Sequence, residues 1–274
     1  MSDLAAAVLG PEPTASLATA FLAANAVAAG AVLAVAPGRL IVRRMFGPAA
    51  ACSLWSIPPL AALASVLVTL SPPAGDVLSP AAAIAGGLPK PGLLLAVWAS
   101  GAIVLAAAFV AAQARFLAEV RAGRGGPAVV GLISPRIVLP AHHGYTPEER
   151  ELIRAHERAH VARKDPRAAA LAALFQCLCW FNPLAHLAAY LLRLDQELAC
   201  DAAVVLRRPN ARALYAKTLL KTQLAATPLP FGCYWPARSR HPLEVRIALL
   251  KPAANKGRPS GTSVVLASIE PIRP

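Results

Sequence analysis

The sequence predicts a mainly α-helical protein in which several membrane helices precede an α+β domain. Of its 274 residues, 57% are hydrophobic and only 15% are charged, whereas an ordinary soluble domain has about 25% charged residues. The apolar residues also gather into uncharged stretches of the length that crosses a bilayer, about 20 residues. We therefore expect an integral membrane protein.

Three uncharged stretches predict a transmembrane region over residues 1–114, with helices at about 15–37, 48–71 and 92–114. Pro58-Pro59 predicts a kink or a shortening of the second helix, because proline interrupts helical hydrogen bonding. Between the first two stretches lie three arginines, Arg39, Arg43 and Arg44. Because basic residues favour the cytoplasmic side, we expect the N-terminus outside and everything after Arg115 inside.

The net charge of +13 arises mostly after residue 114, since only four of the 27 Lys/Arg and three of the 14 Asp/Glu precede it. This charge suits the anionic headgroups of membrane lipid. No recognisable nucleic-acid motif accompanies it, so direct nucleic-acid binding is not expected. Five cysteines without metal-binding CxxC spacing predict reduced, buried thiols rather than a disulfide framework.

Residues 115–250 predict a domain that contains both strands and helices. The segment Pro127–Pro140 holds two short β-branched runs, which are typical of a hairpin. A helix that extends to about Lys164 opens with three start signals, the cap Thr146, Pro147 and the capping-box residue Glu149. Asp165-Pro166 repeats the cap signal, so we expect Asp165 to be a helix N-cap rather than a metal ligand.

A short pattern in the first of these helices, RAHERAHVARKD, predicts a metal site. His156 and His160 are four residues apart and therefore share one face of the helix. Two neutral imidazoles are good zinc ligands, and a catalytic zinc needs one more protein ligand and a water. Glu157 follows the first histidine and suits the general base that activates this water. The alternative is that both histidines belong to the polar face of an amphipathic helix.

A second group, ELACD, favours the metal site over that alternative. Glu197 and Asp201 are also one helical turn apart. Glu197 is the expected third ligand, and Asp201 the acceptor that fixes the tautomer of a histidine. Cys200 is a rival third ligand, and an exposed acidic face is the competing explanation. Asp195 should face elsewhere on the helix, in solvent.

Glu197 follows His160 by 37 residues, yet both must reach one ion. A straight membrane crossing between them would separate the ligands. Asn182-Pro183 interrupts this apolar stretch, and the arm before it has 14 residues, about 21 Å of helix, too short to span. We therefore expect residues 168–201 to form a re-entrant or interfacial helical hairpin that returns Glu197 to the zinc.

The strand before the active-site helix is a candidate substrate-binding edge, made of Arg136, Ile137, Val138 and Leu139. Peptidases often hold a substrate as an added strand, although a purely structural hairpin explains the pattern equally well. Tyr190 and Tyr215 are both candidate oxyanion donors, and the sequence does not choose between them.

From Ser134 to about Leu220 the chain resembles the BlaR/MecR antirepressor family of bacterial membrane zinc metallopeptidases. The matching elements are SPRIVLP, HERAHVARKDP, FNPLAHLAAYLLRLDQELACDAAV and RALYAKTLL. The resemblance implies a gluzincin-like fold, one Zn²⁺ per chain on His156, His160 and Glu197, and Glu157 as catalytic acid/base. It also implies a multi-pass protein of the bacterial inner membrane that cleaves a cytosolic transcriptional repressor, often with self-cleavage.

The chain departs from the best-known members of this family in one respect. It ends at Pro274 and contains no Ser-x-x-Lys motif, so penicillin sensing is not expected and the signal should come through the membrane or a separate sensor protein. Residues 251–274 are expected to form a flexible tail. Two other functions stay open: a membrane quality-control or prenyl-protease-like peptidase, and a non-catalytic scaffold or sensor subunit.

Overall fold

A computed structural model describes residues 11–71, 91–139, 144–224 and 240–250, and most of them are helical. The expected tail at 251–274 lies outside this described part. The predicted mainly α fold, with apolar helices ahead of a domain that contains few strands, is confirmed.

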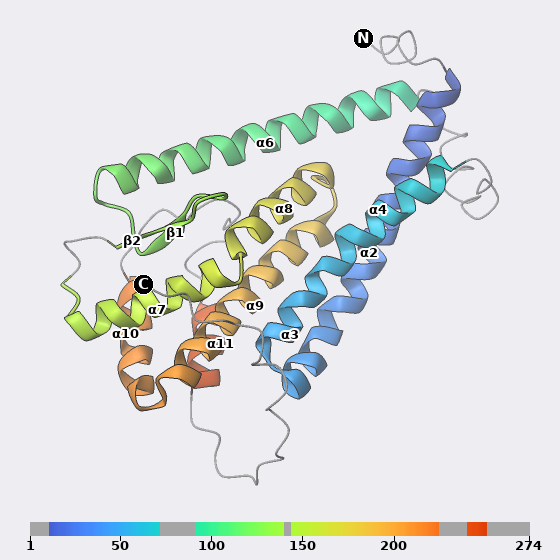
Figure 1. The fold of residues 1–274 in the computed structure, drawn as a ribbon. Helices are drawn as coiled ribbons and strands as arrows, with labels where there is room; N and C mark the ends of the chain where they lie inside the picture. Colours follow the sequence, from blue (N-terminus) through green and yellow to red (C-terminus); the bar gives the residue numbers. More distant parts are fainter. Residues whose placement is uncertain (1–10, 72–90, 140–143, 225–239, 251–274) are drawn as a thin grey trace.

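Within the described ranges, three helical segments are long and apolar enough to cross a membrane, at Thr14–Phe46, Pro48–Leu70 and Pro91–Arg121. The first belongs to α2 (Pro11–Phe46) and the third is α6 (Pro91–Arg121). The second consists of three consecutive pieces, α3 (Pro48–Ser53), η1 (Leu54–Ser56) and α4 (Ile57–Leu70). Helices α2 and α4 lie side by side (Figure 1).

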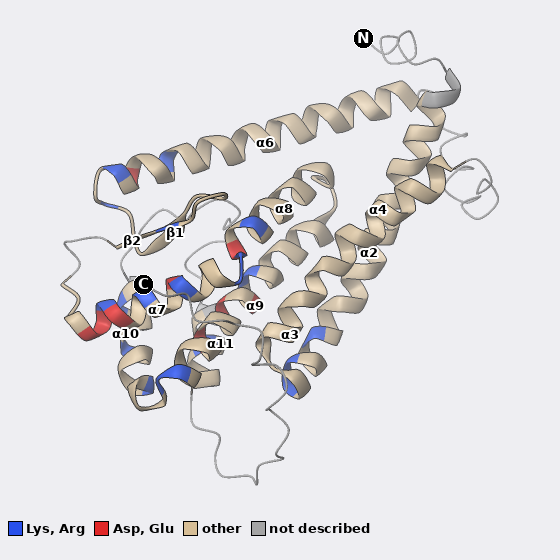
Figure 2. Cartoon of the chain, viewed as in Figure 1, with Lys and Arg blue, Asp and Glu red and all other residues tan. Residues whose placement is uncertain are grey.

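Pro58 and Pro59 of the second segment occupy the first turn of α4. Proline is tolerated there because the first amides of a helix have no helical acceptor. The three arginines expected between the first two spans are instead helical, within the last two turns of α2. Figure 2 shows charged residues at one end of α2, at one end of α6 and on the later helices, while residues 14–38 of α2, the whole of α4 and residues 91–114 of α6 carry none.

The predicted hairpin is present as β1 (Ala128–Val130) and β2 (Arg136–Val138), which pair antiparallel with Val129 opposite Ile137. The following elements are helical: α7 (Pro147–Ala162), α8 (Asp165–Leu178), α9 (Pro183–Arg207), η2 (Pro209–Ala211), α10 (Arg212–Leu224) and α11 (Arg240–Leu250). Both strands contact α7, and α9 contacts α7, α8 and α11. Helix α9 is therefore the centre of this half of the molecule.

Helices α8 and α9 form an antiparallel pair whose turn lies against α2 and α6 (Figure 1). The Asn182 side chain accepts a hydrogen bond from the Leu184 amide at 3.0 Å and thereby caps α9. At the turn, the Trp180 indole donates a hydrogen bond to the Trp98 carbonyl of α6 at 3.1 Å. The ring centroids of Phe181 and of Phe21 in α2 are 5.5 Å apart. The break at Asn182-Pro183 thus lets α9 run back toward α7.

The expectation that Asp195 is solvated is wrong. Its side chain is 0% exposed and bonds to Arg39 of α2 and Trp55 of η1. The reason is tertiary: α9 packs on α2 and η1, which cover the face of α9 that carries Asp195. The prediction of reduced thiols is confirmed for the four cysteines in the described ranges, all of which are free and buried.

Candidate metal centre

The predicted start of α7 is confirmed, and it determines which side of the helix the two histidines occupy. Thr146 Oγ1 accepts from the Glu149 amide at 3.2 Å, and Glu149 Oε2 accepts from the Thr146 amide at 2.9 Å. Lys221 of α10 also binds Glu149, at 2.8 Å. His156 and His160 then fall one turn apart on the buried side of α7, 7% and 5% exposed.

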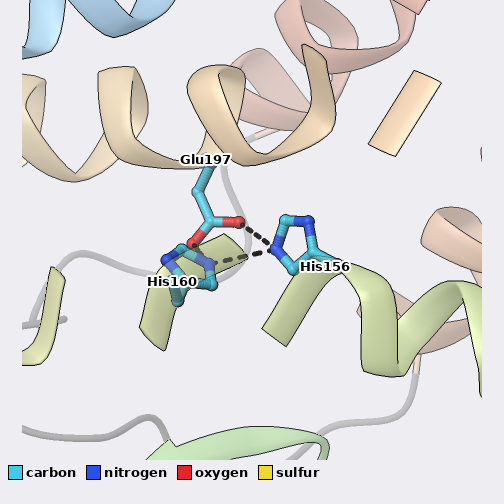
Figure 3. Close-up of side chains that lie close together, drawn as sticks. All are labelled: His156, His160 and Glu197. Carbon is cyan, nitrogen blue, oxygen red and sulfur yellow. Dashed lines mark hydrogen bonds and ion pairs between the residues drawn. The ribbon is translucent and has the colours of Figure 1, made fainter. Parts of the chain in front are cut away.

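The structure brings both histidines together with Glu197 of α9 (Figure 3). The Nε2 atoms of His156 and His160 are 3.1 Å apart. Glu197 Oε2 lies 3.2 Å from His156 Nε2, and Glu197 Oε1 lies 3.6 Å from His160 Nε2. Ligand atoms around a tetrahedral zinc with bonds of about 2.0–2.1 Å are separated by about 3.3 Å. The three donor groups therefore have the spacing of one face of a zinc tetrahedron.

The second nitrogen of His160 is held by Asp165, because Nδ1 lies 2.8 Å from Asp165 Oδ2. The prediction that Asp165 is an N-cap is wrong. Lys164 takes the cap position with a left-handed φ of 59°, and Asp165 becomes the first residue of α8. Its carboxylate consequently points to the histidine. A carboxylate on Nδ1 keeps the proton there and leaves Nε2 with a lone pair for a metal.

The second nitrogen of His156 is held through Tyr215 of α10. The Tyr215 hydroxyl lies 2.8 Å from His156 Nδ1 and donates to Asp201 Oδ1 at 2.6 Å. Asp201 itself is 3.4 Å from His156 Nδ1. The expected role of Asp201 as a direct acceptor is thus shared with the tyrosine. The hydroxyl of Tyr215, one of the two candidate oxyanion donors, is committed to this pair of contacts.

Two arginines, Arg193 and Arg246, balance the acidic residues of the site, and the sequence analysis missed Arg246. Arg246 of α11 bonds Asp201 at 2.7 and 2.8 Å and lies 3.0 Å from Glu197 Oε2, while Arg193 lies 3.1 Å from Glu197 Oε1. Burial by itself would raise the pKa of Glu197, but Arg246 and Arg193 outweigh it and hold that pKa well below its usual value. The Glu197 carboxylate is therefore ionised and able to bind a cation. In a chain with 27 basic residues, nothing local distinguishes Arg246.

The surroundings of His156 favour its protonated form. Burial would lower the pKa of His156, but its contacts with Asp201 and Glu197 outweigh burial and raise the pKa to about 10. A metal that binds Nε2 must displace this proton.

The candidate base Glu157 and the rival ligand Cys200 are also buried in this part of the structure. Glu157 is buried on α7, 8% exposed, directly after His156. Cys200, the rival third ligand, has its Sγ 3.4 Å from Nδ1 of His160 and 3.5 Å from Asp165. The thiol therefore lies beside the nitrogen that Asp165 binds rather than among the Nε2 atoms.

The candidate substrate edge lies next to the helix that carries the histidines. Arg136, Ile137 and Val138 form β2, and Leu139 follows the strand. Since β2 pairs with β1 on one side only, its other edge is not paired with a strand of the described part. Arg136 is exposed, and the three residues that follow it are partly buried.

The candidate metal centre lies within the part of the chain that matches a known family. Residues 119–250, from the end of α6 to the end of α11, match the family described as BlaR1 peptidase M56. The regulatory protein BlaR1 of Bacillus licheniformis is 31% identical over 80 residues, which cover 29% of this chain and 13% of that protein. The alignment thus covers a small part of the relative's length. No solved structure matched the chain.

Proposed function

Because residues 119–250 belong to the BlaR1 peptidase family, we propose that this membrane peptidase is a zinc endopeptidase whose ion is held by His156, His160 and Glu197. The observation that carries the proposal is the spacing of the three donor groups, 3.1, 3.2 and 3.6 Å between ligand atoms from two facing helices. Zinc, when bound there, would polarise the scissile carbonyl and acidify a water.

The residues of the chain then have separate tasks. Glu157, buried beside His156, is the base that takes a proton from the attacking water and returns it to the leaving amine. Asp165 keeps the proton of His160 on Nδ1. The Tyr215–Asp201 pair does the same for His156. Once His156 has lost its second proton, both imidazoles can present an Nε2 lone pair to one metal ion beside Glu197.

The substrate is a protein, and we assign its binding to the unpaired edge of β2, with Leu139 at the end of the strand. A substrate strand added to this edge would run alongside a hairpin that contacts α7, the helix that carries Glu157. Backbone hydrogen bonds of this kind bind many sequences, so side-chain pockets would have to supply the specificity.

The biological substrate in this proposal is a cytosolic transcriptional repressor, which is cleaved in response to a signal from the membrane region or a separate sensor. Self-cleavage is part of the same proposal. Its support is the family match together with the apolar helices. In this arrangement residues 1–114 are embedded in the bacterial inner membrane with the N-terminus outside. Residues 115–250, which carry the site, face the cytoplasm. The helical hairpin of residues 168–201 enters the bilayer or lies at its surface.

The test combines zinc stoichiometry with cleavage in purified full-length protein. Wild type should bind one zinc, Glu197→Ala should lose most of it, and Glu157→Gln should keep the zinc and lose cleavage. Glu151→Gln, which removes an exposed carboxylate from the same helix, is the matched control and should change neither property. Full zinc binding by Glu197→Ala would refute the ligand set.

The same catalytic variant separates the competing functions in cells. One regulator that accumulates in Glu157→Gln cells supports signalling, whereas many accumulating membrane proteins support quality control. An unchanged proteome and phenotype would support a non-catalytic scaffold.

A further inference from the structure

Asp195 lies at a buried junction between α9 and the first part of the chain. We call α2, α3, η1 and α4 (Pro11–Leu70) the membrane arm. Asp195 Oδ1 accepts from Arg39 of this arm at 2.7 Å, and Oδ2 accepts from the Trp55 indole at 2.8 Å. Arg43 lies 3.7 Å from Oδ1. Both oxygens are thus satisfied by residues 140 or more positions earlier in the chain.

The two halves of α9 have different neighbours. Its first half packs on the membrane arm, where Ala188 joins the apolar cluster of Val32, Val35 and Trp55. Its second half carries Glu197 and Asp201 of the candidate metal centre. Asp195 stands where these halves meet. Because α9 is one continuous helix of 25 residues, a displacement of either half moves the other.

Asp195 and Glu197 use opposite sides of this helix. Residues two positions apart differ by about 200° around a helix axis. Asp195 accordingly faces the membrane arm, while Glu197 faces the histidines of α7 (Figure 3). Any rotation of α9 about its axis that weakens the bond to Arg39 also turns Glu197 relative to His156 and His160.

We propose that Asp195 is a positioning residue, which fixes the rotation of α9 against the membrane arm and thereby sets the position of the metal ligand Glu197. This inference rests on the proposed metal site. A buried charge without a partner is strongly unfavourable, so the pairing with Arg39 selects one rotation rather than a range of them. A movement of α2 in the bilayer would reach the metal centre through this contact.

The test measures the metal centre itself in full-length protein reconstituted in lipid nanodiscs. Zinc affinity is obtained by competition with a chelator, and the ligand geometry from the visible spectrum of the Co²⁺-loaded protein. Asp195→Asn and Arg39→Met should each weaken zinc binding at least tenfold, the lower end for groups that orient metal ligands, and should alter the Co²⁺ bands. Arg39→Lys keeps the charge and should restore most of the affinity.

Val32→Ala is the matched control, because it loosens the same interface without touching the carboxylate. It should lower the melting temperature and leave affinity and spectrum unchanged. Wild-type affinity and spectrum in Asp195→Asn and Arg39→Met, or an equal loss in Val32→Ala, would overturn the proposal. Wild-type protein that binds no Co²⁺ or Zn²⁺ would instead refute the proposed function. If the charge variants do not fold, Trp55→Phe, which removes one hydrogen bond, should still shift the spectrum, and an unchanged spectrum would overturn the proposal.

Discussion

Replacing Asp165 with asparagine tests how the metal centre is prepared for its ion. The substitution keeps the shape of the side chain and an acceptor oxygen but removes the charge that His160 Nδ1 meets at 2.8 Å. Both side chains are buried, so water cannot replace the lost interaction. The imidazole becomes a weaker electron donor through Nε2, and we expect zinc affinity to fall.

The expected loss of zinc affinity depends on how much the hydrogen bond between His160 and Asp165 strengthens when the metal binds. The bond exists with and without metal, so only the part that strengthens on metal binding affects affinity. Removing such a partner typically costs about 10–100-fold in metal affinity. Because asparagine retains an acceptor, we expect the lower end, about tenfold or 1.4 kcal/mol. Asp165→Ala, which removes the acceptor as well, should approach the upper end of that range.

The assay is competition for zinc between the purified protein and a chromophoric chelator of known affinity. Glu151→Gln removes the same charge from α7 at a position that is 52% exposed, and should bind zinc within a factor of two of wild type. If Asp165→Asn binds zinc as tightly as wild type, His160 does not depend on this carboxylate and our account of its tautomer is wrong.

Three further predictions concern packing, capping and protons. A methyl group at Gly101 would overlap the Trp180 ring, so Gly101→Ala should cost about 1–3 kcal/mol of stability, while Gly38→Ala, with open space around it, should not lower the melting temperature. Thr146→Ala removes the cap of α7 and should cost about 1 kcal/mol in denaturant unfolding. Burial lowers the pKa of His156, but its contacts with Asp201 and Glu197 outweigh burial and raise that pKa to about 10. Zinc binding at pH 7.5 should therefore release about one proton. The apparent zinc affinity should then rise with pH until the pH reaches the pKa of His156. Titration calorimetry in two buffers of different ionisation enthalpy should give different binding heats because a proton is released, and equal heats would contradict this prediction.

The features predicted correctly from the sequence depend on neighbours in the chain. The capping box of α7 spans four residues, and the two histidines are separated by one turn, so local helix geometry brings them together. The break at Asn182-Pro183 is likewise a local signal, and it correctly implied that α9 returns toward α7.

The features missed depend on partners far away in the chain. Asp195 was expected in solvent because no local signal reveals Arg39, which precedes it by 156 residues. Asp165 was expected to cap a helix because the left-handed conformation of Lys164 has no signature in a lysine, a residue that rarely adopts it. Arg246 enters the site only through the packing of α11 on α9. In each case burial and charge pairing, rather than propensity, decide the role of the side chain.

These distant partners explain how the donor groups stay together before a metal arrives. Glu197 and Asp201 would repel each other if no cation were near, but Arg246 contacts both and His156 carries a proton between them. The guanidinium and the imidazolium thus supply positive charge where zinc would later supply it. With Asp195 anchoring the other face of α9, the ligands are held by the fold and not by the ion, unlike small zinc domains that fold only on metal binding. In the proposed site, metal binding would then need the loss of a proton from His156 rather than the assembly of the ligands.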